Sequence, residues 1–251
     1  IDGTVIGGTT AAAGTFTTGQ FNTSLNVDGT AVTDGLTVAG NVSIDGGTIK
    51  LDGNYPVGTA NVALGDAALN GSITGNYNTA LGNFSMQPLT SGASNTGVGN
   101  SALRFVTSGS SNTAVGDSSL FSNTTADNNT AVGQAALGSN TTAANNTAVG
   151  YAALTANTTG TQNVAVGSQS LLAHTTGNYN VAVGQNALIS NTTASDNTSV
   201  GAFSLDANTT GAYNTAVGKE ALGSNTTADN NTAVGYQAGY SNTTGDVTAF
   251  G

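Results

Sequence analysis

Several residue types on which enzymes and nucleic-acid-binding proteins depend are scarce in this 251-residue chain. Cysteine and tryptophan are absent, there are two prolines and one histidine, and charged residues make up 6% of the total. Without cysteine, neither disulfides nor thiolate metal sites can form. Three basic residues stand against 13 acidic ones, which gives a net charge of −10. We therefore expect no binding to nucleic acid, because that binding depends on basic residues that neutralise phosphates.

Long apolar runs are missing as well, so the sequence predicts no insertion into a membrane. Glycine is abundant, with 36 residues, and asparagine, threonine, alanine and serine supply much of the remainder. Low charge with many small residues is compatible with disorder. Here, however, the apolar residues keep fixed places along the chain. This regularity indicates an ordered structure held together by stacking.

An asparagine recurs every 17 residues without insertion or deletion, and each one opens a pentamer of the form Asn-(Thr/Val)-(Ala/Gly/Ser)-(Val/Leu)-Gly. An uninterrupted period this short is typical of a solenoid, in which each coil stacks on an equivalent coil. Stacked asparagines can form a ladder of side-chain amides. The 11 residues of the predicted structural ladder are Asn61, Asn78, Asn95, Asn112, Asn129, Asn146, Asn163, Asn180, Asn197, Asn214 and Asn231.

Two further positions of the repeat are apolar when each repeat is numbered from its asparagine as position 1. Position 4 is Val or Leu, position 5 is Gly, and position 9 is Leu except at Met86 and Gly239. Short apolar stretches bounded by glycine and by Asn-Thr-Thr turns predict two short strands per coil. The predicted apolar row includes Val115, Val132, Val149, Val166, Val183, Leu137, Leu154 and Leu171.

The predicted fold is therefore all-β, a parallel β-solenoid of 17-residue coils with equivalent residues about 4.8 Å apart. One Val and one Leu per coil contribute roughly 3–6 kcal/mol when buried. Ordering the backbone costs on the order of 1–2 kcal/mol for each residue. Because a single chain buries so little, we expect an obligate oligomer, a homotrimer whose chains share their apolar rows.

The chain divides into two predicted domains. In residues 1–56 the 17-residue period is absent, and short alternating strands end in glycine turns, as in Leu25-Asn26-Val27-Asp28-Gly29 and Val42-Ser43-Ile44-Asp45-Gly46. Asp-Gly is a strong hairpin-turn signal, and such narrow strands predict a thin, intertwined β-shaft. Residues 57–251 are the predicted solenoid.

Two resemblances to known families add to this interpretation. The pentamers Asn112-Thr113-Ala114-Val115-Gly116 and Asn163-Val164-Ala165-Val166-Gly167 resemble the head repeats of trimeric autotransporter adhesins, which implies a left-handed β-roll in a trimer. Ile1-Asp2-Gly3-Thr4-Val5-Ile6-Gly7, with Ala12 to Thr18, is similar to a module of bacteriophage tail fibres. Together they imply a virion fibre. The alternative is a trimeric adhesin head on a bacterial surface.

The sequence predicts no catalytic, metal or cofactor site. Glu220, the only glutamate, is expected to form a solvated pair with Lys219. Asp66 and Asp117 occupy position 6 whereas Asp127 occupies position 16, and this scatter argues against a paired-carboxylate glycosidase. A polysaccharide-degrading tailspike, with carboxylates paired between chains, remains a lower alternative.

Structural roles are also expected for the single histidine and for three tyrosines that share one position of the repeat. His174 takes position 12, where most repeats have asparagine, and is expected to lie at the surface in a turn. Tyr77, Tyr179 and Tyr213 share position 17. Packing in a trimer or on the next coil is expected for them ahead of sugar stacking.

These observations lead us to expect a structural protein, the trimeric shaft of a phage tail fibre or similar appendage. The shaft would hold a receptor-binding tip away from the virion. Its expected partners are further copies of itself, other virion proteins of the tail or appendage, and a host-surface glycan or protein that serves as the receptor.

Overall fold

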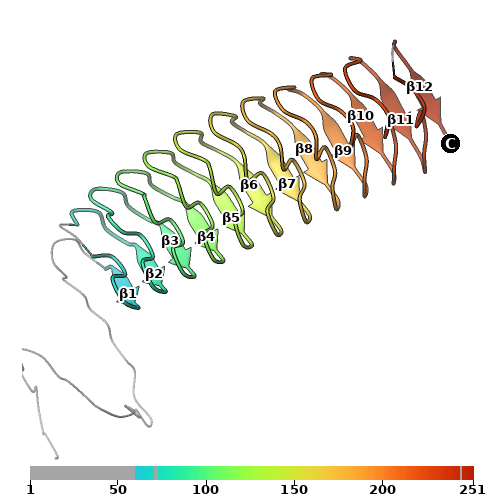
Figure 1. Cartoon of the computed structure of the whole chain (residues 1–251). Coiled ribbons are helices and arrows are strands. Elements are labelled where there is room, and N and C mark those ends of the chain that lie inside the picture. The colour runs from blue at the N-terminus through green and yellow to red at the C-terminus, as the bar shows by residue number, and fades with distance from the viewer. Residues whose placement is uncertain (1–59, 71–72, 244) are drawn as a thin grey trace, which may run out of the picture. The chain divides into compact units, whose positions relative to one another are not determined.

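A computed structural model describes residues 60–70, 73–243 and 245–251, and these form a parallel β-solenoid (Figure 1). The prediction of an all-β solenoid with 17-residue coils is confirmed. Twelve three-residue strands form one sheet in sequence order, and the described residues contain no helix. The strands are β1 (Val62–Leu64), β2 (Thr79–Leu81), β3 (Thr96–Val98), β4 (Thr113–Val115), β5 (Thr130–Val132), β6 (Thr147–Val149), β7 (Val164–Val166), β8 (Val181–Val183), β9 (Thr198–Val200), β10 (Thr215–Val217), β11 (Thr232–Val234) and β12 (Thr248–Phe250).

Each strand pairs only with the strands of the coils before and after it, so the sheet grows by one strand per coil along one flank of the solenoid (Figure 1). The register joins equivalent positions, for example Thr130 with Thr147 and Val132 with Val149. The last coil is one residue shorter, yet Thr248 still pairs with Thr232. Stacking of like on like therefore organises the whole array.

The strands alternate, and this alternation corrects one prediction. In β5 and β6 the alanine at position 3 points inward and is fully buried, whereas Val149 at position 4 remains 36% exposed. Successive side chains of a strand point to opposite faces, so positions 2 and 4 must lie outside when position 3 lies inside. The valine row is therefore on the outer face of the single chain. Of the predicted row, Val115, Val132 and Val149 are exposed, and Val166 and Val183 are half-buried.

The other predicted apolar row does lie in the interior. Leu137, Leu154 and Leu171 at position 9 are fully buried, as is Met86 at the same position. Together with the small residues of positions 3 and 8, these leucines form one continuous core cluster along the described coils. Most coils thus enclose one large aliphatic side chain, and the coils of Met86 and Leu103 enclose a second one, Leu89 and Val106 respectively.

The predicted second strand of each coil is wrong, because the segment that carries the leucine forms a turn. Ala135 at position 7 and Leu137 at position 9 both have left-handed backbone conformations, with φ of 57° and 51°. The Ala135 N–H donates to Asp117 O of the preceding coil at 3.0 Å, and the Leu137 N–H donates to Ala153 O of the following coil at 3.0 Å. A left-handed residue costs about 1–2 kcal/mol, and these contacts between coils offset that cost.

Glycine at position 5 is required at the end of every strand. Gly133 has a φ of 134°, a conformation that side chains disfavour. A Cβ atom added there would lie 2.3 Å from Gly150 O in the next coil. The same position therefore needs glycine both for its backbone angle and for the close stacking of coils.

The predicted β-shaft in residues 1–56 lies outside the described residues. Within the described ranges, no helix is long and apolar enough to cross a membrane.

Candidate functional site

The asparagines at position 1 lie inside the coils and connect them. All 11 are buried. Asn112 is representative: its backbone N–H and its Nδ2 both donate to Asn95 Oδ1, at 2.9 and 3.1 Å. Its Nδ2 also donates to Ala126 O at 2.8 Å, at position 15 of its own coil. Each side chain therefore closes its own coil and binds the preceding one, which is the ladder geometry that the sequence predicts.

Position 12 forms a second buried polar row, which the sequence interpretation missed. Asn140 Nδ2 donates to Asn123 Oδ1 at 3.3 Å and to Ala143 O at 2.9 Å. Asn157 Nδ2 repeats the pattern with Asn140 Oδ1 at 2.9 Å. The asparagine of the Asn-Thr-Thr turn therefore bonds the backbone of its own turn, and its side chain is directed inward.

His174 belongs to this second row, so its predicted place at the surface is wrong. The side chain is fully buried. Its Nε2 lies 2.8 Å from Gly177 O, and its Nδ1 lies 3.4 Å from Asn191 Nδ2. A carbonyl can only accept and an amide nitrogen can only donate, so the neutral tautomer with a proton on Nε2 satisfies both neighbours. Burial lowers the pKa of His174, and the hydrogen bond to Gly177 opposes part of that shift.

The histidine also explains an unsatisfied atom in the preceding coil. Asn157 Oδ1 is buried without a hydrogen-bond partner. In Asn123, Asn140 and Asn208 this oxygen accepts from the asparagine of the next coil, but His174 directs its only N–H to Gly177 O. A signal for the inward direction was present in the sequence. Leu89 and Val106 hold position 12 in earlier coils, and both are buried.

Three aspartates of the array, Asp117, Asp127 and Asp229, accept from a backbone N–H or a neighbouring amide of another coil. Asp127 Oδ1 accepts the Ser110 N–H at 2.7 Å, and Asp229 Oδ1 accepts the Ala212 N–H at 2.7 Å. Both lie at position 16, one coil beyond the group that they bind. These carboxylates thus serve stacking at the surface. The described residues contain no group of three or more His, Cys, Asp or Glu side chains that would hold a metal ion.

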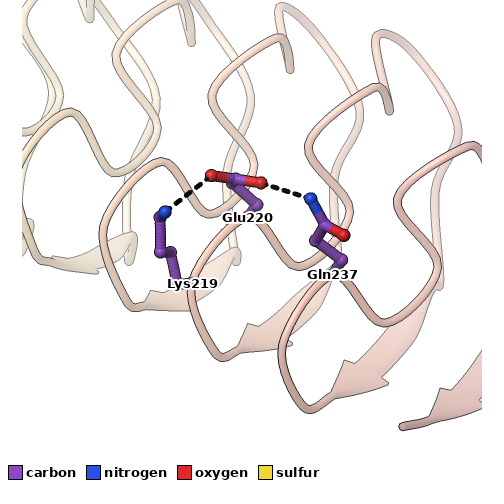
Figure 2. Close-up of polar contacts among 3 residues, drawn as sticks. All are labelled: Lys219, Glu220 and Gln237. Carbon is purple, nitrogen blue, oxygen red and sulfur yellow. Dashed lines mark hydrogen bonds and ion pairs between the residues drawn. The ribbon is translucent and has the colours of Figure 1, made fainter.

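Glu220 pairs with Lys219, as the sequence suggests, and also contacts the next coil (Figure 2). Lys219 Nζ lies 3.1 Å from Glu220 Oε1, and Gln237 Nε2 donates to Glu220 Oε2 at 2.6 Å. The hydrogen bond from Gln237, followed by the contact with Lys219, lowers the pKa of Glu220. Burial raises the pKa of Asp206 in the preceding coil, and the Glu220 charge adds to this effect.

Aromatic side chains gather at two places and lie singly elsewhere. Arg104 lies 4.3 Å from the centre of the Phe84 ring and 5.5 Å from that of Phe105. Phe105 meets Phe121 edge to face, with ring centres 4.9 Å apart. At the second place, Lys219 Nζ lies 5.8 Å from the centre of the Tyr236 ring, and the Tyr240 ring lies over Gly223. The three tyrosines of position 17, which are Tyr77, Tyr179 and Tyr213, are exposed on the single chain rather than packed on the next coil.

The outer face of the sheet forms a regular surface along the solenoid. Position 4 supplies a row of Val and Leu side chains from β1 to β11, and position 2 supplies a neighbouring row of half-buried Thr and Val. No charged residue occupies either row in these strands. We call this surface the valine face. No family model, curated protein or solved structure matches this chain.

Proposed function

We propose that this chain forms the shaft of a homotrimeric adhesion fibre, belonging to a phage tail or a similar appendage. The observation that carries the proposal is the valine face. It follows the strands β1 to β11, carries an apolar side chain at position 4 of every coil, and is partly exposed in the single chain, as Val149 illustrates at 36%. Extended exposed apolar surfaces mark interaction sites in soluble proteins.

Further copies of the same chain are the occupant that fits this face. An in-register row with one apolar residue every coil is matched by another row with the same spacing, and a second copy provides it. Each valine would contribute on the order of 1 kcal/mol when the remaining exposed area is covered. The contribution repeats along the whole array, so the interface grows with the solenoid. Closure around a three-fold axis places three valine faces together without leaving one exposed.

The interior of the coil supports a mechanical role. Each coil is joined to its neighbours by strand pairing, by the position-1 asparagines and by the backbone contacts of the left-handed turn. A rod with bonds at every coil resists local opening and bending. The resemblance of the pentamers to trimeric adhesin heads, and of the first residues to phage fibres, favours a left-handed trimer on a virion. A bacterial surface adhesin is the alternative of the same class.

Sedimentation equilibrium of the full chain in native buffer tests the proposal. We expect a species with three times the 24.3 kDa chain mass, and elongated particles by negative-stain electron microscopy. A folded species at the mass of one chain would overturn the proposal. The flanking genes and sequence then separate the two appendages, since a baseplate-binding segment indicates a phage and a membrane-anchor barrel indicates an autotransporter.

A further inference from the structure

One corner of the coil is formed by positions 6, 7 and 10. The stacking of equivalent residues does not explain which residue types occur at these positions. Most interior positions repeat the same residue, as stacking requires. At this corner the coils differ from one another, and both basic residues of the described ranges, Arg104 and Lys219, lie here. In repeat proteins, the face where units vary is often the face that binds.

The most diverse group at this corner spans the coils that contain β9 to β11. We call it the polar-aromatic patch, and it consists of Asp206, Lys219, Glu220, Tyr236, Gln237 and Tyr240.

Its polar members hold one another in place across two coils. Glu220 is fixed from both sides, by Lys219 at 3.1 Å and by Gln237 at 2.6 Å (Figure 2). Lys219 Nζ also lies 5.8 Å from the centre of the Tyr236 ring. The charge of Lys219 is thus balanced within the patch, and it is not left free to attract an anion.

Its aromatic members remain open to solvent. Tyr236 is 62% exposed and Tyr240 is 43% exposed. Gly223 lies beneath the Tyr240 ring: a Cβ atom there would be 2.7 Å from a ring carbon and 3.2 Å from Asp206 Oδ1. The glycine lets the ring of Tyr240 lie across the preceding coil, so that an aromatic surface and a carboxylate stand side by side.

We propose that the polar-aromatic patch binds a neutral oligosaccharide. The C–H groups of a sugar ring carry a partial positive charge, which the negative face of an aromatic ring attracts. The hydroxyl groups of the same sugar can donate to the carboxylates of Asp206 and Glu220 and accept from the Gln237 amide. Three neighbouring coils span roughly 10 Å, which accommodates a short oligosaccharide rather than a single sugar.

The charge of the chain selects a neutral ligand over an acidic one. The net charge is −10, and the patch itself holds two carboxylates and one ammonium group. An acidic polysaccharide would be repelled by both. This inference rests on the proposed adhesive function and deepens it, because it names the chemistry of a receptor and the residues that contact it.

Binding is measured with the full chain by saturation-transfer NMR and calorimetric titration, using maltohexaose, cellohexaose and chitohexaose one at a time. We expect at least one of them to bind. Tyr236→Ala and Tyr240→Ala should each weaken binding about tenfold, which corresponds to about 1.4 kcal/mol, because each removes an aromatic face that contacts the sugar. Glu220→Gln, which removes a charged acceptor but keeps the shape, should also weaken binding.

Tyr77→Ala is the matched control, because Tyr77 is 64% exposed but lies at position 17 of the first coil. We expect it to leave binding unchanged. The proposal is overturned if none of the three hexasaccharides binds, or if Tyr77→Ala weakens binding as much as Tyr236→Ala does. Sedimentation of the same samples separates the two proposals. If the chain is a trimer that binds no sugar, only the proposed sugar site is rejected. If the chain is a monomer that binds sugar, only the proposed trimeric fibre is rejected.

Discussion

Asn129 and Asn146 hold position 1 of neighbouring coils, and the Asn146 backbone N–H donates to Asn129 Oδ1 at 2.9 Å. Asn146 Nδ2 donates to Gly160 O at 2.8 Å, and Asn146 Oδ1 accepts from the backbone N–H of Asn163 at 2.9 Å. One side chain therefore donates within its own coil and accepts from the next. Among side chains of this size, the amide supplies both functions at neutral pH.

Asn146→Asp should destabilise the solenoid near neutral pH. The carboxylate keeps the acceptor for Asn163, but its second oxygen faces the Gly160 carbonyl, where two acceptors meet. We expect a loss of about 1–3 kcal/mol per chain, the cost of an unsatisfied buried group. The loss should shrink at low pH, where a protonated carboxyl donates again. Denaturation midpoints across pH measure this effect.

Asn145→Asp is the control for this substitution. Asn145 is adjacent to Asn146 in the sequence but is exposed. It occupies position 17, and another coil has an aspartate, Asp196, at this position. The same chemical change should therefore alter the midpoint little. Equal losses in the two variants would contradict the assigned role of the buried ladder.

Gly133→Ala should destabilise the array by more than about 2 kcal/mol, because the φ of 134° disfavours a side chain and the added Cβ lies 2.3 Å from Gly150 O. Gly138→Ala is a matched control. A Cβ atom at Gly138 comes no closer than 3.2 Å to its neighbours, and the equivalent residue of the next coil is Thr155. Thermal denaturation compares the two, and equal melting temperatures would contradict the requirement for glycine at position 5.

The fold followed from the sequence wherever a single residue type repeats without exception. The asparagine of position 1 and the glycine of position 5 predicted a stack of parallel coils, and both lie at contacts between coils. The direction of side chains was harder to predict. Val149 and Ala148 differ by one position, and the apolar character of valine suggested the interior although the strand turns it outward. The side chains of a strand point alternately inward and outward. Which of them point inward can be assigned only when the first and last residues of the strand are known.

His174 shows a second limit of sequence interpretation. Asparagine and threonine are typical of exposed turns, so a histidine among them was expected at the surface. The turn in fact directs position 12 into the coil, where polar groups bind one another. Leu89 and Val106 at the same position are buried, and their apolar character is the feature of the sequence that indicates the inward direction. The polar-aromatic patch was missed because its members come from three coils.

The valine face and the leucine core should respond differently to substitution. Val149→Asp places a charge on the outer face, which is 36% exposed at this residue, so the folded single chain should tolerate it. In the proposed trimer that charge would be buried without a partner, which is costly. We expect loss of the trimer in sedimentation experiments, with the circular dichroism of the folded coils retained.

Leu154→Ala should instead destabilise the folded chain itself. Leu154 is fully buried within its own coil, and its removal should lower stability by about 2–5 kcal/mol through loss of packing and an internal cavity. Unfolding and dissociation should then occur together. If Val149→Asp leaves the trimer intact, the valine face is not the interface between the chains and the proposed trimer contact is refuted.

His174 should make stability depend on pH. Its pKa in the folded chain is lowered by burial, whereas the unfolded value is about 6.5. The unfolded chain therefore binds the proton more readily below this pH, and stability falls as the pH decreases from about 7 through the unfolded pKa. Protonation would also place an N–H on Nδ1 opposite the Asn191 amide, 3.4 Å away, so two donors would meet. Melting temperatures between pH 7 and 5 measure the decline.

His174→Asn isolates this effect from the other titrating groups. The asparagine would restore the position-12 row and give Asn157 Oδ1 a donor, as in neighbouring coils. We expect equal or higher stability at pH 7 and a flatter dependence on pH down to 5. Asp206, whose pKa is raised, acts with the opposite sign, since its carboxyl is protonated more readily in the folded chain and stabilises it in acid. If the variant loses as much stability as the parent between pH 7 and 5, His174 is not the group that titrates.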